Sequence, residues 1–187
     1  MALHHITCVV VIVFLGSVWS MPTPHACQLQ RNLIETTHRL LETMGGHFPL
    51  QCVEENVKIS FPATVIESNK QQGTGAAKAV YEVLKSIDAL FDNDSIPDQW
   101  DATKLDDFQN IVYRQIEESK CIMSKTEESN DDFPARKAAV RIFFDKLSAV
   151  LKEKVYSFCA WEIVRKELQY ALRSILDDKS NLLWSKN

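Results

Sequence analysis

The residues of this sequence that could do chemistry are its five cysteines, five histidines and several pairs of adjacent acidic residues. No two cysteines form a CxxC pair and no histidine pair after the first twenty residues has metal-ligand spacing, so we expect neither a metal nor a cofactor. Acidic neighbours such as Asp106-Asp107 do not share a helix face, which indicates solvated surface rather than an acid–base dyad. His38 falls within a predicted helix and reads as a boundary residue, and no serine stands in a nucleophile elbow. The sequence therefore predicts no enzyme.

The first twenty residues resemble a cleaved secretory signal. The apolar run CVVVIVFL over 8–15 is too short to span a bilayer, and Val18-x-Ser20 is a plausible small-residue cleavage site. No second apolar run of spanning length follows, so we expect no membrane insertion. The predicted product is a secreted, extracellular chain with a single domain over 21–187, about 167 residues and long enough for a real core.

Signal removal leaves an even number of cysteines, which in an exported chain indicates two disulfides. The four are Cys27, Cys52, Cys121 and Cys159. Four cysteines allow three pairings, and their count alone does not choose among them. The formal charge of −4 gives no cue for a nucleic acid or an anionic membrane as a partner.

Five stretches have apolar residues at helical spacing, and no convincing strand interrupts them. We expect helices over 28–44, 76–91, 101–121 and 135–156, and a fifth that has Cys159 just inside its start and fades beyond Leu176. A loose tail follows over 177–187. Gly45-Gly46 ends the first helix, and a long segment without periodicity then runs to about Gly75. The turn after the second helix holds one glycosylation sequon, at Asn93. The pattern predicts an all-α bundle with the long overhand connection of helical cytokines.

The stretch LKEKVYSFCAWEIVRKELQ, over 151–169, joins the last two helices through a very short turn. At about 100° per residue, Trp161 and the apolar residues that follow it form a core stripe. The members of this stripe are Trp161, Val164, Leu168, Leu172 and Ile175. The opposite, solvated side is predicted to hold Glu162, Lys166, Gln169 and Arg173. Cys159, Ile163 and Tyr170 lie away from the core stripe, which indicates that something packs or docks beside them.

The segment CAWEIVRKE, preceded by LKEKVYS, resembles the carboxy-terminal motif of the type I interferons. QWDATKLDDFQNIVYRQIEESKC, over 99–121, resembles the third helix of that family, and with the cysteine positions the resemblance covers most of 27–175. It is nearest to the four-cysteine interferons of bony fish. The resemblance implies a five-helix, up-up-down-down cytokine bundle. It also implies a ligand that bridges heteromeric type I interferon receptor chains, of the class II cytokine type, and triggers JAK-STAT antiviral signalling.

In that family one receptor chain engages the first helix, the long loop and the last helix, while a second chain engages the opposite side. The positions that match this contact region are Val53, Glu54, Asn56, Lys58, Arg165, Lys166, Gln169 and Tyr170. Arg165 matches a basic residue of the motif. Lys166, Gln169 and Tyr170 depart from it, and Val53 and Asn56 stand where mammalian members often carry leucine and arginine. The detailed hot spot of the mammalian members is therefore not carried over to this sequence.

The expected helix directions choose one disulfide pairing. A long first crossover makes the first two helices parallel, and if the third runs back, its end at Cys121 lies near Cys27. The tight hairpin then places Cys159 at the same end of the bundle as Cys52. We expect Cys27–Cys121 and Cys52–Cys159, with the second bond placing Val53 to Lys58 beside Lys166, Gln169 and Tyr170.

Two other functions fit the composition. A secreted helical carrier would hold an apolar ligand between its helices, and should therefore have an interior pocket of several hundred cubic ångströms. A helical cytokine outside the interferons would share the fold and the mode of signalling but not the hairpin motif.

Overall fold

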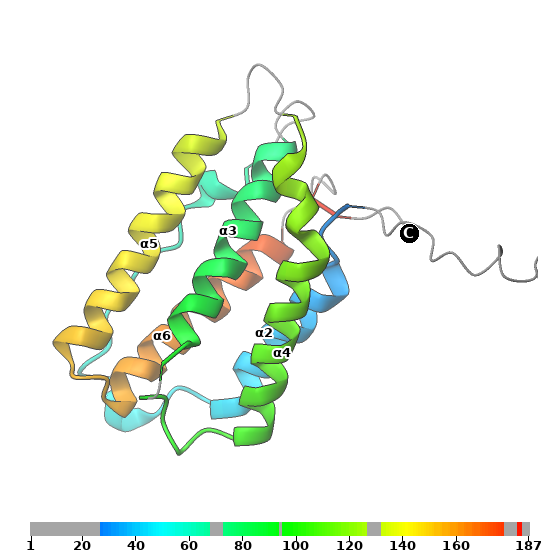
Figure 1. The fold of residues 1–187 in the computed structure, drawn as a ribbon. Coiled ribbons are helices and arrows are strands. Elements are labelled where there is room, and N and C mark those ends of the chain that lie inside the picture. The colour runs from blue at the N-terminus through cyan, green and yellow to red at the C-terminus, as the bar shows by residue number, and fades with distance from the viewer. Residues whose placement is uncertain (1–26, 68–72, 94, 127–131, 178–182, 185–187) are drawn as a thin grey trace, which may run out of the picture.

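The structure is a computed structural model that describes residues 27–67, 73–93, 95–126, 132–177 and 183–184. Within these residues it contains five α-helices, and its only β-structure is one isolated bridge (Figure 1). The helices are α2 (Arg31–Gly45), α3 (Gly73–Phe91), α4 (Ala102–Ser119), α5 (Phe133–Glu153) and α6 (Phe158–Leu176). The all-α prediction is therefore confirmed. The predicted signal peptide over 1–20 lies outside the described residues.

The helices begin and end where the sequence provides capping groups. The α2 helix stops at Gly46, whose φ of 67° is in the left-handed region that glycine adopts at little cost. At the start of α4, the Asp101 carboxylate accepts a hydrogen bond from the amide of Lys104. The Ser157 hydroxyl accepts one in the same way at the start of α6. Each of these two caps satisfies an amide in the first turn of its helix that has no partner within the helix.

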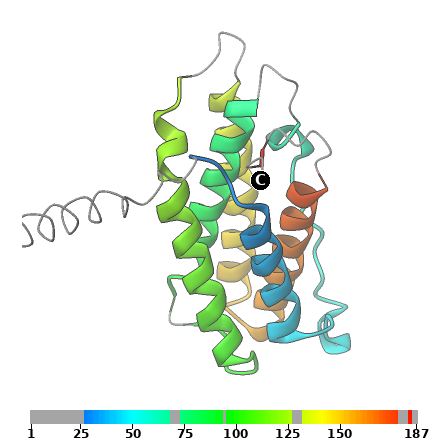
Figure 2. The same cartoon turned by 90° about the vertical axis from the view of Figure 1, so that its right-hand side faces the viewer.

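The contacts at the helix ends give the direction of each helix. The amide of Asp101, just before α4, donates to the carbonyl of Met44 near the end of α2, so these two helices are antiparallel. Phe91, the last residue of α3, packs on Phe108 in the second turn of α4 with ring centroids 4.8 Å apart. Since α2 and α3 both end where α4 begins, they are parallel, and the segment between them must cross the length of the bundle (Figure 2).

The last two helices complete the bundle. Phe133, the first residue of α5, lies beside Lys78 near the start of α3, so α5 runs parallel to α3. The short turn after α5 sends α6 back in the opposite direction, where it packs between α5 and α2. Helices α2, α3, α4 and α6 therefore run up-up-down-down, and α5 covers the edge between α3 and α6. This is the predicted helical-cytokine topology.

An aromatic cluster fills the middle of the core. Trp161 on α6 packs against Phe91, with centroids 5.5 Å apart, and against the edge of Trp100. The Trp161 side chain is fully buried, so its predicted place in the core is confirmed. Leu168, Leu172 and Ile175 continue the same buried stripe along α6. Close packing of this kind leaves little room for a ligand among the helices.

The carboxy-terminal segment differs from its prediction as a loose tail. Trp184 is only 6% exposed and forms a parallel backbone bridge with Leu29, just before α2. The Arg31 guanidinium lies 5.3 Å from the centre of the indole ring. Leu183 is buried as well. A short apolar run gives no helical periodicity, so the pattern along the sequence could not show that Trp184 docks against the start of α2.

Candidate functional site

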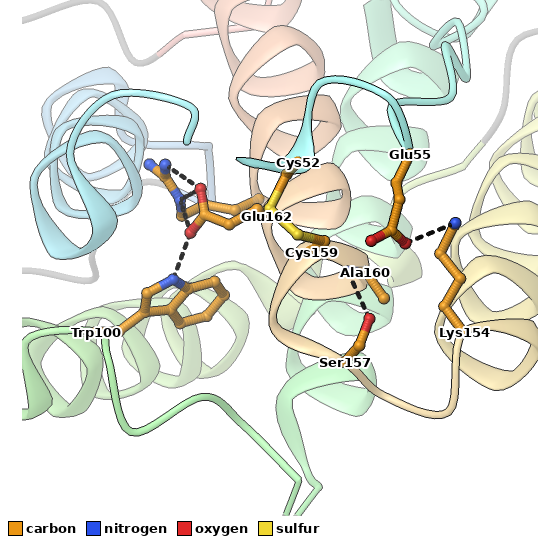
Figure 3. Close-up of a disulfide and its surroundings, with 9 residues drawn as sticks. Cys52, Glu55, Trp100, Lys154, Ser157, Cys159, Ala160 and Glu162 are labelled. Atoms are coloured by element: carbon orange, nitrogen blue, oxygen red, sulfur yellow. Dashed lines mark hydrogen bonds and ion pairs between the residues drawn. A yellow bond between two sulfur atoms is a disulfide. The ribbon is translucent and has the colours of Figure 1, made fainter. Parts of the chain in front are cut away.

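The disulfide Cys52–Cys159 fixes the first part of the crossover segment to the start of α6 (Figure 3). The two Cα atoms lie 5.2 Å apart, and Cys52 belongs to a short 3-10 helix, η2 (Leu50–Cys52). Beyond it, the Glu55 carboxylate pairs with the Lys154 ammonium at 2.9 Å, which ties the loop to the end of α5 as well. The other disulfide joins Cys27 to Cys121. Both pairs are those that the helix directions predict.

The side of α6 that was predicted to be solvated is largely covered. Glu162 is fully buried, and one of its oxygens accepts a hydrogen bond from the Trp100 indole N–H at 2.6 Å (Figure 3). Ile163 is also fully buried. The prediction of an exposed Glu162 is therefore wrong. Glu162 is buried because the disulfide and the end of α2 lie across this side of α6 and exclude water from it.

Arg165 is buried too, and this corrects its predicted role as a receptor contact. Its side chain is 2% exposed and forms an ion pair with Glu162, with 2.6 Å between Nη2 and Oε2. The guanidinium also donates to the carbonyl oxygens of Leu41 and Gly46, at 2.9 Å each. The Leu41 carbonyl lies near the end of α2 and the Gly46 carbonyl follows it, so the guanidinium binds the carboxy-terminal end of this helix. Arg165 therefore stabilises the point at which the chain leaves α2 and enters the loop, and it presents no surface to a partner.

Gly45 is required by the same cluster. A Cβ atom at this position would lie 2.6 Å from Nε of Arg165 and 2.9 Å from Oε1 of Glu162. Both atoms are held by hydrogen bonds and an ion pair and are packed in the interior, so they have little freedom to move. Even alanine would disturb the buried ion pair.

Lys166 and Gln169 are only partly exposed, because both bind neighbouring backbone or loop groups. Nζ of Lys166 donates to Oδ1 of Asn56 and to the carbonyl of Val57, and it lies 5.7 Å from the centre of the Phe48 ring. Gln169 donates to the carbonyl of Leu41 on α2 at 3.1 Å. The expectation that the Lys166 and Gln169 side chains are exposed to solvent is therefore correct only in part. The same bonds hold the loop against α6.

The remaining predicted contact residues form an exposed surface. Tyr170 is 59% exposed, one turn along α6 from Lys166, as its helical phase predicts. The loop residues Val53, Glu54, Asn56 and Lys58 are exposed as well. Because Lys166 bonds directly to Asn56, the loop and α6 residues belong to one continuous surface. We call Val53, Glu54, Asn56, Lys58, Lys166, Gln169 and Tyr170 the loop–α6 patch.

Two exposed aliphatic residues near this patch gave no signal in the sequence. Leu50 is 89% exposed in η2, and Val155 is 83% exposed in the turn between α5 and α6. Periodicity treats apolar residues as candidates for the core, so it could not identify them. The one usable clue was the tight turn KVYS, which has no glycine, so a residue with a side chain, such as Val155, must take part in reversing the chain.

The environment of His38 fits a structural residue better than a general base. It is half-buried, and desolvation, followed by the nearby charge of Arg173, lowers its pKa below the 6.5 that is usual for histidine. Glu42 and Asp177 act in the opposite direction. Among the described residues, no group of three or more potential metal ligands lies close enough to hold an ion.

A groove of about 660 Å³ lies between α3 and α5. It opens to the surface, and charged residues such as Lys137 and Arg141 line its rim beside Phe144. It is therefore no interior site of the kind that a carrier of apolar ligands needs. Asn93 lies at one end of this groove, and its side-chain oxygen accepts a hydrogen bond from the amide of Ser95 at 2.7 Å.

A filled up-up-down-down core, a long first crossover and a disulfide that fixes this crossover to the last helix define a helical cytokine. The interferon alpha/beta domain model matches residues 26–179. Horse interferon alpha-1 is 32% identical over 139 residues, covering 72% of this chain and 75% of its own length. Human interferon alpha-7 is 30% identical over 154 residues, covering 79% of this chain and 77% of its own.

Solved structures agree with these relatives. Zebrafish interferon 2 is 49% identical with a TM-score of 0.77, over 80% of this chain and 98% of the zebrafish chain. Zebrafish interferon 1, at 22% identity and a TM-score of 0.63, shares the fold over 81% of this chain and 95% of its own. The chain belongs to the interferon alpha/beta family, the type I interferons, and resembles those of fish. It is an interferon cytokine, so both alternatives, the carrier and the non-interferon cytokine, are overturned.

No helix in the described part of the chain is long and apolar enough to cross a membrane.

Proposed function

We propose that this interferon is secreted and acts by joining two chains of a heteromeric type I interferon receptor, of the class II cytokine type. Joining them would bring receptor-associated Janus kinases together and start JAK-STAT antiviral transcription. The observation that carries the proposal is family membership, since the interferon alpha/beta domain covers 26–179 and hence the helices and both disulfides. The carbonyl-capping Arg165 and the disulfide give the long loop a defined position, which a rigid contact surface needs.

We assign the tighter-binding receptor chain to the loop–α6 patch. It combines the exposed aromatic ring of Tyr170 with the partly exposed cation of Lys166 and the polar loop residues Asn56 and Lys58. Aromatic residues surrounded by polar groups are typical of the energetically dominant part of protein interfaces. Because Lys166 and Cys159 hold the loop before binding, little conformational entropy is lost on association.

The second receptor chain would engage the opposite side of the bundle. Helices α3 and α5 lie in front of α6 in Figure 1, whereas the crossover segment passes behind α6 and contacts its other side. Two receptor chains placed on these two sides would not compete for the same residues. A ligand with two separate surfaces can therefore hold both chains at once.

Replacing Tyr170 tests the patch. Tyr170→Ala removes an exposed side chain, so helix content and melting temperature should stay nearly unchanged, while affinity for the tighter receptor ectodomain should fall by about 1–3 kcal/mol. Lys166→Ala should have a comparable effect, because it loses both a contact and the bond to Asn56. Surface plasmon resonance with each receptor ectodomain would measure both variants, and an interferon-response reporter in fish cells would measure signalling.

Tyr113→Ala is the matched control, because Tyr113 is a similarly exposed tyrosine on α4, away from the patch. It should bind the same ectodomain as tightly as the wild type. Unchanged binding by both Tyr170→Ala and Lys166→Ala would show that the patch only covers the loop. A wild-type protein that binds neither ectodomain and leaves the reporter silent would refute receptor bridging itself.

Secretion and glycosylation complete the proposal. Cleavage after Ser20 would leave the single domain over 21–187, and amino-terminal sequencing of the secreted protein should begin at Met21. Asn93 would carry an N-linked glycan, because its sequon lies in the turn after α3 and its side chain is partly exposed. Enzymatic deglycosylation should then lower the apparent mass of the wild type and leave that of Asn93→Gln unchanged.

A further inference from the structure

The turn between α5 and α6 contains two adjacent residues with an unfavourable backbone conformation. Val155 has φ of 51° and Tyr156 has φ of 54°, and they are the non-glycine residues with positive φ in the described part of the chain. The left-handed region is costly for any residue with a Cβ, and a β-branched residue such as valine is a genuine outlier there. Such conformations persist where the surrounding structure determines them, and they cluster at functional sites.

The reversal of the chain explains the backbone of this turn. The amide of Tyr156 donates to the carbonyl of Leu151 at 2.7 Å, and the amide of Ser157 donates to that of Lys154 at 3.0 Å. These bonds close the end of α5 and place Ser157 as the cap of α6. The two positions therefore need left-handed residues, for which glycine and asparagine are the inexpensive choices.

The side chains at the two positions differ in what they do for the fold. Tyr156 is half-buried and packs against the hydrophobic core, so its ring accounts for a tyrosine there. Val155 is 83% exposed and is absent from the core cluster. The fold explains the backbone conformation at 155 but not the choice of an exposed, β-branched, apolar side chain for it.

The position of the turn shows which surface of the molecule Val155 adjoins. Lys154, its neighbour in sequence, pairs with Glu55 of the loop, and Cys159 bonds to Cys52 (Figure 3). Both links hold the turn beside the loop segment that carries Val53 and Leu50, which are themselves exposed. The turn therefore adjoins the loop–α6 patch at the end where α6 begins.

We infer that Val155 is a contact residue for the receptor chain that binds the loop–α6 patch, and that it extends this patch onto the α5–α6 turn. With Leu50 and Val53 it offers an aliphatic surface to an apolar area of the receptor ectodomain. Apolar side chains that stay exposed in the free ligand gain from burial only when the partner covers them. The inference rests on the proposed function and adds a contact that the sequence motif did not indicate.

The test uses substitutions that suit the turn but remove the apolar side chain. Val155→Gly and Val155→Asn both tolerate the left-handed conformation, so each should keep the wild-type melting temperature or raise it by about 1–4 °C. Each should nevertheless weaken binding to the patch-binding ectodomain about three- to tenfold, with no change in binding to the other ectodomain. Val155→Leu keeps an apolar side chain and should bind within about twofold of the wild type. A variant that is at least as stable but binds more weakly separates contact from folding.

Ile142→Ala is the matched control, because Ile142 is also an exposed aliphatic residue but lies on α5 about three helical turns before the α5–α6 turn. It should leave binding to the patch-binding ectodomain unchanged. Unchanged binding by Val155→Gly and Val155→Asn, while Tyr170→Ala binds weakly, would overturn this inference and leave the proposed function intact. Lower melting temperatures for both variants would assign Val155 a structural role, and this result would overturn the inference as well. A wild type that sediments as a dimer, with Val155→Gly a monomer, would assign the aliphatic surface to self-association instead.

Discussion

Arg165 shows why a basic residue within a recognised motif is not necessarily a contact. Its guanidinium is planar and has five donors, which here serve the Glu162 carboxylate and the carbonyls that end α2. A buried charge of this kind needs every partner, because removing one leaves the other charge without compensation. Any effect of Arg165 on receptor binding would then act through the position of the loop.

Replacing Arg165 should therefore lower stability before it lowers binding. Arg165→Ala leaves Glu162 as an unpaired buried carboxylate, and we expect it to reduce the free energy of unfolding by about 3–5 kcal/mol. Arg165→Lys keeps the charge but not the planar set of donors, so its loss should lie in between. Guanidinium denaturation with both disulfides intact would measure these losses. Full stability with weakened receptor binding would instead restore Arg165 as a direct contact.

His38 gives the folded protein a dependence on pH. Burial, and then the charge of Arg173, lower its pKa, so the unfolded chain binds a proton more readily than the folded one. The resulting stability is fully present above the unfolded value of 6.5 and is lost as the pH falls towards the lowered pKa. Urea midpoints at about pH 7.5 and pH 5.5 should differ less for His38→Gln than for the wild type. An equal response of His38→Gln and the wild type would contradict the assignment.

At the scale of elements, α6 is covered on more sides than a surface helix. The helices α2 and α5 flank it, the aromatic cluster lies on its inner side, and the loop with η2 lies across the outer side. Charged residues can occupy this covered side only because Glu162 pairs with Arg165, and Glu167 with Lys166. The carboxy-terminal segment covers the start of α2 in a comparable way, through Trp184.

The docked carboxy-terminal segment should contribute to stability. Trp184→Ala removes an almost fully buried side chain, and we expect a loss of about 2–3 kcal/mol in the free energy of unfolding. Hydrogen exchange should also become faster at the start of α2, where Trp184 contacts Leu29 and Arg31. Trp184→Phe keeps most of the apolar area and should lie closer to the wild type. Unchanged exchange in Trp184→Ala would show that the segment does not stabilise α2.

At the scale of the whole molecule, the two disulfides have different tasks. Cys27–Cys121 joins the start of α2 to the end of α4, at one end of the bundle. Cys52–Cys159 lies at the opposite end and fixes the loop to α6, next to the loop–α6 patch. Both constrain the unfolded chain over long separations of 94 and 107 residues, so each stabilises the fold through a similar loss of chain entropy.

Removing each disulfide in turn should separate stability from binding. The double variants Cys27→Ser/Cys121→Ser and Cys52→Ser/Cys159→Ser should each lose up to about 4–5 kcal/mol of stability. At a temperature where both remain folded, only the second should bind the patch-binding ectodomain more weakly, because only it frees the loop from α6. Circular dichroism would verify folding and surface plasmon resonance would compare affinities. Equal affinities for the two variants would show that the Lys154–Glu55 ion pair and the Lys166–Asn56 hydrogen bond suffice to position the loop.

Particular residues show how far the sequence alone could go in predicting this surface. The phase of α6 gave the exposure of Tyr170 and the burial of Trp161 correctly, since each depends on one helix against one core. The same reasoning failed for Glu162, and the family motif failed for Arg165, because the loop and the end of α2 cover both side chains. Ile163 is buried, as the expected Cys52–Cys159 bond beside it predicts. Val155 was missed because its exposure comes from a turn, where helical periodicity has ended.

The sequence by itself determined the five helices, their approximate ends and the family, because apolar spacing, capping residues and the CAWEIVRKE motif are local in the chain. It also supported the disulfide pairing, since a long crossover and a tight hairpin restrict the helix directions. Only the tertiary structure decided what covers the outer side of α6 and where Trp184 packs. The physical reason is that periodicity gives the direction of a side chain around its own helix, whereas burial depends on segments distant in sequence that lack periodicity of their own.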